Sequence, residues 1–305
     1  MSKALVIRNL SKQYSNGTKA LVDVNLEIEK GDFFGLLGPN GAGKTTTIEI
    51  ISSITKKTSG TILIDGIDID NDFEKAKSRI GLVPQEFNCN YFETVWDIII
   101  KQAGFYGILP NQAKDYAEFL LKKLKLTDKK DTICRKLSGG MKRRLMIARG
   151  MIHKPSILIL DEPTAGVDVE LRREMLKFIK EINNLGTTVI LTTHYLEEAE
   201  ELCKNLAILN KGKIAVNTSV KSIVEKLNKE SFILDLSHKI EEIPNSLKQF
   251  DVVKISTKTI EVTISKDQTL NDVFDVLNKY DIRVQSLKNK TNRLEEFFIN
   301  LAGQN

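Results

Sequence analysis

Residues 38–46, GPNGAGKTT, have the spacing G-x-x-x-x-G-K-[ST] of a phosphate-binding loop. Glycines at these positions let backbone N–H groups turn inward around phosphate oxygens. We expect Lys44 to reach the β- and γ-phosphates of a bound nucleotide and Thr45 to place its hydroxyl on Mg²⁺. The competing interpretation is a glycine-rich turn with an accidental lysine. The residues expected to line the loop are Gly38, Pro39, Asn40, Gly41, Ala42, Gly43, Lys44, Thr45 and Thr46.

Two adjacent acids end the apolar segment SILILDEP, residues 156–163. A buried parallel strand delivers its C-terminal residues to the ligand crevice of an open sheet. Asp161 is therefore expected to hold Mg²⁺ through water, and Glu162 to orient or deprotonate an attacking water. The alternative is a solvated acidic turn, but the presence of a phosphate loop favours the catalytic interpretation.

The segment LSGGMKRRLMIARG, residues 137–150, indicates a second anion site. Ser138 is a suitable N-cap, and Gly139 and Gly140 free the backbone N–H groups at the start of a helix. Each glycine inside a helix costs about 1 kcal/mol relative to alanine, so the pair predicts that backbone comes close to a ligand. A helix N-terminus is a ready site for an anion.

Two further polar residues stand at the ends of expected elements. His194, one of three histidines, ends the segment TTVILTTH. Because the C-terminal ends of parallel strands lie at the ligand crevice, His194 is expected near the nucleotide, where a ring nitrogen could hold the γ-phosphate. A structural histidine is the simpler interpretation. Asp168, in TAGVD, is a candidate N-cap for a helix that begins near Val169.

The elements that position these residues alternate apolar strands with amphipathic helices. FFGLLG and SILILDE are continuous apolar runs, as expected of strands buried on both faces. Residues from about 86 to 150 show helical periodicity, which predicts a helical subdomain. The alternation predicts an α/β fold with a largely parallel sheet.

The pattern changes near residue 217. Residues 218–305 contain short strands, in ESFILDLS, DVVKIST, KTIEVTIS and DIRVQSLKN, and helices, in TLNDVFDVLNKY and NRLEEFFINLAG. We therefore expect a first domain at 1–217 and a C-terminal α+β accessory module at 218–305.

Composition narrows the class of protein. The chain has 305 residues, and its three cysteines form no CxxC pair, which argues against a zinc ribbon or disulfide framework. No apolar run approaches the roughly 20 residues that cross a bilayer, so we expect a soluble chain. The net charge is +5, and residues 218–305 carry 13 basic and 13 acidic side chains, so no basic tail calls for nucleic acid. The cluster Lys142, Arg143 and Arg144 is interpreted as a solvated helix face.

The order of these motifs resembles the ATP-binding-cassette (ABC) ATPases across residues 1–217. Within that family, LSGGMKRRLMIARGMIHKPSILILDEPTAGVDVELRREM and VILTTHYLEEAE are similar to the ATP-binding subunits of ABC-2-type exporters, in the YadG-type subgroup. GLVPQEFNCNYFETVWDII and the C-terminal module are also typical of such subunits. The resemblance implies a P-loop NTPase nucleotide-binding domain, with a mixed sheet and a helical subdomain, that uses ATP and Mg²⁺.

The resemblance assigns roles within one chain. It implies that Tyr14 stacks on adenine, where sequence alone favours a half-buried strand tyrosine. It implies that Gln85, in LVPQE, contacts Mg²⁺ or water and links the nucleotide site to the helical region. His194 matches the histidine that contacts the γ-phosphate.

The resemblance also implies a pair of chains. Ser138, Gly139 and Gly140 would complete the nucleotide site of a second copy, head to tail, and Asp168 lies in the loop where two subunits meet. Met141 departs from the glutamine usual in the wider family, and methionine cannot donate a hydrogen bond.

The expected function is a cytoplasmic ATPase subunit, peripheral on the inner face of the cell membrane, that drives export by a separate integral membrane permease. Coupling segments of the permease are expected near residues 92–96, whose aromatics are otherwise ordinary helix core. The alternative is a non-transport ABC ATPase acting on ribosomes or DNA, but such relatives generally carry two cassettes or a long coiled-coil insertion. No nucleic-acid partner is expected.

Overall fold

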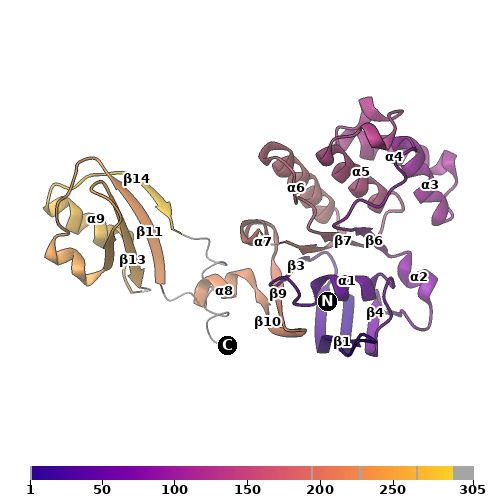
Figure 1. Ribbon diagram of the computed structural model, residues 1–305, viewed down its shortest axis with the longest axis horizontal. Coiled ribbons are helices and arrows are strands. Elements are labelled where there is room, and N and C mark those ends of the chain that lie inside the picture. Colours follow the sequence, from indigo (N-terminus) through magenta and orange to yellow (C-terminus); the bar gives the residue numbers. More distant parts are fainter. Residues whose placement is uncertain (1, 194, 227–228, 266, 291–305) are drawn as a thin grey trace. The chain divides into compact units, whose positions relative to one another are not determined.

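The computed structural model describes residues 2–193, 195–226, 229–265 and 267–290 (Figure 1). The chain divides into two units, Met1–Thr218 and Ser219–Asn305, and each is described by itself. The expected α/β architecture with an added α+β module is confirmed.

A six-stranded sheet forms the centre of the first unit, in the order β10-β9-β3-β8-β7-β6. Its strands are β3 (Phe33–Leu37), β6 (Ile80–Val83), β7 (Ile157–Asp161), β8 (Thr188–Thr192), β9 (Asn205–Asn210) and β10 (Lys213–Ser219). β3 runs parallel to β8 and β9, and β7 runs parallel to β6 and β8. Every residue of β3, β7 and β8 is buried, as expected of predominantly apolar strands covered on both faces. Parallel strands bring their carboxyl ends to one edge, where the polar residues that follow them meet.

A four-stranded antiparallel sheet, in the order β2-β1-β4-β5, packs beside the central sheet. Its strands are β1 (Lys3–Gln13), β2 (Lys19–Glu29), β4 (Ser59–Ile64) and β5 (Ile67–Asp68). β1 and β2 each have 11 residues. Register shifts interrupt their pairing, which divides each long strand into shorter alternating stretches.

The helices of the first unit take two kinds of position. They are α1 (Lys44–Ile51), α2 (Phe73–Lys77), α3 (Val95–Phe105), α4 (Pro110–Lys123), α5 (Gly139–Met151), α6 (Val169–Asn184) and α7 (Leu196–Leu202), with 3₁₀ turns η1 (Thr127–Lys129) and η2 (Cys134–Lys136). α1 lies between the two sheets, since Ile48 and Ile51 share one core with residues of both. α3, α4 and α5 gather on one side of the unit, away from the antiparallel sheet, as Figure 1 shows.

The second unit is an antiparallel sheet, in the order β12-β13-β11-β14, with one helix against it. Its elements are α8 (Val220–Lys226), β11 (Lys229–Leu236), η3 (Asn245–Gln249), β12 (Asp251–Lys254), β13 (Thr259–Ser265), α9 (Leu270–Lys279) and β14 (Val284–Asn289). Alternate residues of β13 are buried, in a core shared with α9. The helix expected over residues 292–303 lies outside the described residues.

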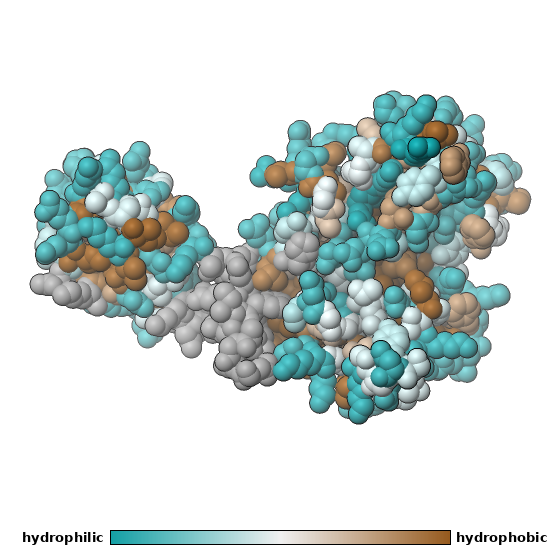
Figure 2. Space-filling model, viewed as in Figure 1, coloured by the Kyte–Doolittle hydropathy of each residue, from teal (hydrophilic) through white to brown (hydrophobic). Residues whose placement is uncertain are grey.

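The surface is largely hydrophilic in the view of Figure 2, where hydrophobic side chains emerge at several places over the part that carries α3, α4 and α5. Among the described residues, no helix has the length and apolar character required to cross a membrane.

Candidate functional site

The phosphate loop connects β3 to α1, and its glycines are required by their surroundings. Gly38 has φ 148°, and a Cβ there would stand 2.3 Å from the carbonyl oxygen of Leu209. Gly43 caps α1 with φ 109°, and its Cβ would stand 2.8 Å from the carbonyl oxygen of Ala20. Gly41, at the exposed tip, has φ 77°. At Gly38 and Gly43, only glycine adopts these conformations so close to neighbouring backbone.

Lys44 is folded back into this loop. Its Nζ donates to the carbonyl oxygens of Gly38 at 2.7 Å and Pro39 at 3.1 Å, and the residue is 9% exposed. Burial lowers the pKa of Lys44, while the carboxylates of Glu162 and Asp161 oppose that shift. An ammonium group held by two neutral carbonyls beside two acids is suited to meet phosphate oxygens.

Asp161 and Glu162 stand where β7 ends. Asp161 is 5% exposed and accepts a hydrogen bond from Thr192 Oγ1 on β8. Burial raises the pKa of Asp161, and Glu162 raises it further, whereas Lys44 and Arg143 act in the opposite direction. Glu162 has a left-handed φ of 47°, and its N–H donates to the Thr192 carbonyl oxygen at 3.1 Å. The paired ends of β7 and β8 therefore fix both acids.

Gln85 reaches the second of these acids from a different strand end. It follows β6, and its Nε2 donates to Glu162 Oε2 at 3.1 Å. Arg143 of α5 holds the same segment, with Nη1 on the Pro84 carbonyl oxygen and Nη2 on that of Gln85, each at 2.7 Å. The structure thus brings Gln85 to Glu162 and joins both to α5.

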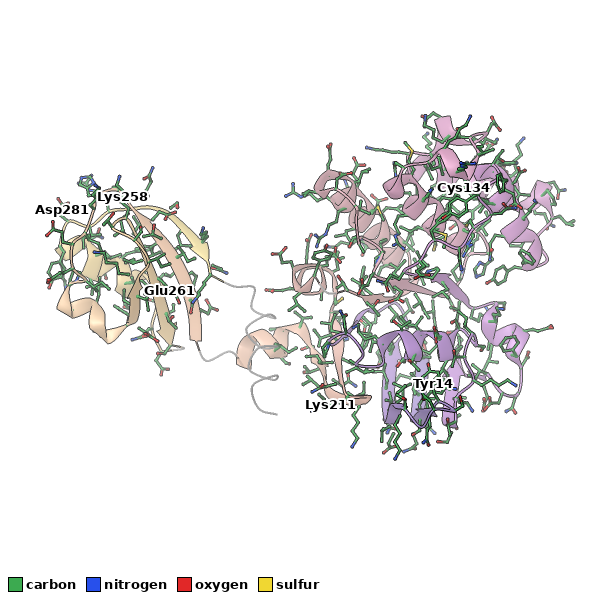
Figure 3. The ribbon with its side chains drawn as sticks, in the orientation of Figure 1. Tyr14, Cys134, Lys211, Lys258, Glu261 and Asp281 are labelled. Atoms are coloured by element: carbon green, nitrogen blue, oxygen red, sulfur yellow. The ribbon has the colours of Figure 1, made fainter. Side chains whose placement is uncertain are left out.

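Tyr14 follows β1 directly (Figure 3). Its hydroxyl lies 3.4 Å from Thr46 Oγ1 in the first turn of α1, and Lys12 Nζ lies 4.8 Å from its ring centroid. The ring is 37% exposed. Tyr14 therefore presents an accessible aromatic face beside the phosphate loop.

The start of α5 is an open helix end. Ser138 is its N-cap and accepts a hydrogen bond from Met141 N at 3.3 Å, as expected from the sequence. A Cβ on Gly139 would meet no atom within 4 Å, and one on Gly140 would lie 3.2 Å from Leu171 Cδ1. Within the described part of the chain, no hydrogen bond joins this helix start to residues 38–46.

Asp168 is the N-cap of α6 and accepts a hydrogen bond from Leu171 N at 3.0 Å. Because Leu171 also faces Gly140, the starts of α5 and α6 adjoin. β8 ends at Thr192, and His194 lies outside the described residues.

The basic cluster is not the solvated face that its sequence indicated. Arg144 is 7% exposed and donates to the Leu124 carbonyl oxygen at the end of α4, at 2.8 Å. Lys142 Nζ lies 5.0 Å from the Tyr91 ring centroid. Each side chain of the cluster faces other parts of the protein, because α5 packs against α3, α4 and β6.

Glu198 gave no signal in the sequence, yet it joins two of the strand-end segments. It is 2% exposed and accepts hydrogen bonds from Thr164 Oγ1 at 2.6 Å and Thr193 Oγ1 at 2.8 Å. Arg172 Nε donates to it at 2.6 Å, and that guanidinium lies 3.9 Å from the Tyr195 ring centroid. The segment after β7 is thereby tied to the segment after β8.

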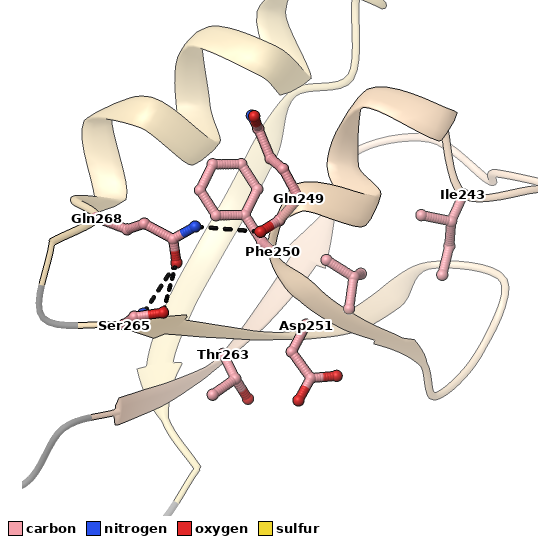
Figure 4. Close-up of a pocket in the computed structure, with 8 residues that line it drawn as sticks. Ile243, Gln249, Phe250, Asp251, Thr263, Ser265 and Gln268 are labelled. Carbon is pink, nitrogen blue, oxygen red and sulfur yellow. Dashed lines mark hydrogen bonds between the residues drawn. The ribbon is translucent and has the colours of Figure 1, made fainter.

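The second unit contains a hollow of about 530 Å³ (Figure 4). Gln268 Nε2 donates to the Gln249 carbonyl oxygen at 3.1 Å, and its Oε1 accepts from Ser265 N at 2.9 Å. Asp251, its charged lining residue, is exposed. Among the described residues that line it, the hollow has no buried charge that would hold a ligand.

Comparisons with known proteins agree with this geometry. A family model described as "ABC transporter" matches residues 21–165. The chain is 34% identical to the linearmycin resistance ATP-binding protein LnrL of Bacillus subtilis (strain 168), over 98% of each chain. It is 39% identical to a Nod factor export ATP-binding protein I of Cupriavidus metallidurans, over 70% of each chain.

Solved structures match a large part of the chain. An ATP-binding subunit of an ABC transporter is 26% identical with a TM-score of 0.68, covering 73% of this chain and 92% of that one. A dimeric structure of the ATP-binding cassette MJ0796, in a post-hydrolysis state with ADP and phosphate, is 28% identical with a TM-score of 0.65. That match covers 71% of this chain and 98% of the other.

Proposed function

The chain belongs to the ABC transporter ATP-binding proteins, and we propose that it is the ATP-hydrolysing subunit of an ABC-2-type exporter. The family membership makes it an ATPase whose hydrolysis is coupled to transport. Two relatives named for resistance and export support the direction of transport. The proposal extends to the residues that act, to Mg²⁺, to a second copy of the chain and to a membrane permease.

We propose that the residues around the phosphate loop hold ATP and position water. Lys44 exchanges its carbonyl partners for β- and γ-phosphate oxygens, and Tyr14 stacks on the adenine. Glu162 accepts a proton from the attacking water, and Gln85 fixes the Glu162 carboxylate through the 3.1 Å hydrogen bond. His194 would contact the γ-phosphate.

The donors available for Mg²⁺ are the Thr45 hydroxyl, the Asp161 carboxylate and the Gln85 amide oxygen. All are hard oxygen ligands, as Mg²⁺ prefers. The raised pKa of Asp161 fits such a site, because a buried carboxylate gains from a nearby cation. When bound, Mg²⁺ neutralises charge that develops on the phosphates.

The proposal of a pair rests on two different segments of the chain that each suit phosphate, the phosphate loop and the start of α5. The loop and the start of α5 share no hydrogen bond within the described part of the chain. Both ends suit phosphate. In a head-to-tail pair, Ser138, Gly139 and Gly140 of one copy meet the nucleotide of the other, and Asp168 lies at the same interface. ATP then favours the closed pair, because only there does its γ-phosphate contact both ends.

We propose that the permease docks beside Tyr91 and Phe92. Phe92 is 75% exposed and Tyr91 43% exposed, and both belong to the segment that follows Gln85. Trp96, at the end of the expected coupling segment, is partly buried, with Lys130 Nζ 3.8 Å from its ring centroid. Docking there would place the chain at the inner face of the membrane.

Recovery of the tagged chain from membranes tests this partner. The wild-type chain should copurify with an integral membrane protein, and Phe92→Asp should reduce that recovery several-fold without changing ATP binding. Phe105→Asp is the matched control, since Phe105 is 84% exposed on α3. Recovery of ribosomes or DNA without a membrane protein would contradict the transport function.

A further inference from the structure

Arg143 lies at the second turn of α5 and contacts a segment that the proposed reaction uses. Its planar guanidinium bridges two consecutive carbonyl oxygens, those of Pro84 and Gln85, each at 2.7 Å. We infer that Arg143 is a positioning residue that couples the start of α5 to the Gln85–Glu162 pair. This inference rests on the proposed function, because only in the nucleotide-bridged pair do both ends meet phosphate.

The link from Arg143 to Gln85 is geometrically defined. A guanidinium that donates two near-parallel hydrogen bonds fixes direction as well as distance. Arg143 is partly buried, which lowers its pKa, and the carboxylates of Asp161 and Glu162 oppose this. An arginine guanidinium does not lose its proton in proteins, so Arg143 keeps its charge, and its position on α5 sets the position of the Gln85 main chain.

The link from Gln85 to Glu162 completes the connection. The Gln85 side chain donates to Glu162 Oε2, while its main chain accepts from Arg143. A displacement of α5 that moves Arg143 thus moves the residue that orients the Glu162 carboxylate. No covalent neighbour provides this path, since Arg143 is 58 residues from Gln85 in sequence.

The start of α5 connects Arg143 to the second nucleotide of the proposed pair. Arg143 lies about 7.5 Å along the helix axis from Ser138, so the two belong to one rigid element. In the proposed pair, the start of α5 contacts the γ-phosphate of the partner's nucleotide. Occupancy of that site therefore helps to position Glu162 at the chain's own site, so that each hydrolysis depends on the other nucleotide.

Arg149 provides a matched comparison on the same helix. It donates to Asn88 Oδ1 at 2.8 Å and to Cys89 Sγ at 3.0 Å, so it holds the same segment beyond Gln85. Both arginines fasten that segment to α5, but only Arg143 contacts the residue that touches Glu162. A merely structural role would make the two equivalent.

A double-mutant cycle on the full chain tests the inference. Arg143→Met keeps an unbranched side chain but cannot donate, and it should lower kcat roughly ten- to a hundredfold, the cost typical of lost supporting partners. KM for ATP and the thermal unfolding midpoint should stay near wild type. In a Gln85→Ala background, Arg143→Met should lower kcat less than about twofold, because non-additivity marks residues that act as a unit. Arg149→Met should keep kcat within about threefold of wild type.

Three results would overturn the inference. They are a wild-type kcat in Arg143→Met, an undiminished loss in the Gln85→Ala background, and an equal loss in Arg149→Met. The proposed function fails separately: it fails if the wild-type chain does not hydrolyse ATP, or if Glu162→Gln does not pair with ATP. A Glu162→Gln, Arg143→Met chain that pairs normally shows that Arg143 affects turnover rather than assembly.

Discussion

At the scale of single residues, the buried Asp161 carboxylate lowers the stability of the nucleotide-free protein. It is 5% exposed beside a second acid, and burial raises its pKa. The folded chain therefore binds a proton on Asp161 more readily than the unfolded chain does. The free energy of unfolding falls as the pH rises from the pKa of Asp161 in the unfolded chain to its higher pKa in the folded chain. Such destabilised groups concentrate at functional sites, where a ligand later compensates them.

Asp161→Asn should raise the thermal unfolding midpoint of the nucleotide-free protein at neutral pH. The amide oxygen still accepts from Thr192, but no buried charge remains. The gain should shrink as the pH falls and the wild-type carboxyl group protonates. Asp168→Asn is the control, because Asn caps a helix as well as Asp. A lower midpoint for Asp161→Asn in differential scanning calorimetry would contradict this account.

The sequence predicted those site residues that belong to motifs of fixed spacing. Lys44, Asp161 and Glu162 follow apolar strands at fixed distances, so their shared edge could be inferred. Arg143 and Glu198 could not be found in this way. The two carbonyl partners of Arg143 lie 58 and 59 residues away in sequence. Two of the partners of Glu198 lie 26 and 34 residues away. Only the fold brings these residues together.

At the scale of elements, α5 begins with a glycine that its own chain does not require. Gly139 has no neighbour within 4 Å of an added Cβ, unlike Gly38, whose Cβ would strike backbone. Alanine is also the better helix former, by about 1 kcal/mol in a helix interior. We infer that glycine at this position serves a ligand outside the chain, which in the proposed pair is the phosphate of the partner's nucleotide.

Gly139→Ala should therefore fold normally and fail as an ATPase. Its unfolding midpoint should match or exceed that of wild type, while kcat falls roughly a hundredfold, the cost of a displacement of about 1 Å at a reaction site. The control is Gly104→Ala in α3, where an added Cβ also meets no atom within 4 Å. Steady-state ATPase assays that found full activity in Gly139→Ala would refute the role of this helix end.

Element types were easier to predict from the sequence than their surroundings. The apolar segments FFGLLG and SILILDE predicted the buried strands β3 and β7, and a serine before two glycines predicted the start of α5. The interpretation of the basic cluster on α5 was wrong, because charge alone does not reveal that α4 and the Gln85 segment cover that face.

At the scale of the whole molecule, each unit has a hydrophobic core of its own among the described residues. One core joins both sheets of the first unit, and the other lies wholly within the second unit. All the residues proposed to bind or hydrolyse ATP belong to the first unit. Independent cores are the physical mark of domains that can fold separately.

A chain that ends after Ser219 should consequently keep the complete strand β10 and bind ATP with an unchanged affinity. Its ATPase rate should stay within about threefold of the full chain, if the second unit adds no catalytic group. Fluorescent-nucleotide binding and ATPase assays on both lengths provide the comparison. Loss of ATP binding by a well-folded shorter chain would show that the second unit contributes to the site.

The central claim is that one chain holds two halves of different nucleotide sites, so that ATP joins two copies. Glu162→Gln should reduce kcat roughly 10²–10⁴-fold and preserve bound ATP. The most direct measurement is the mass of Glu162→Gln by size-exclusion chromatography with light scattering. The account predicts a dimer with ATP and Mg²⁺ and a monomer without nucleotide. A chain that binds ATP and Mg²⁺ yet remains monomeric at every protein concentration tested would contradict it.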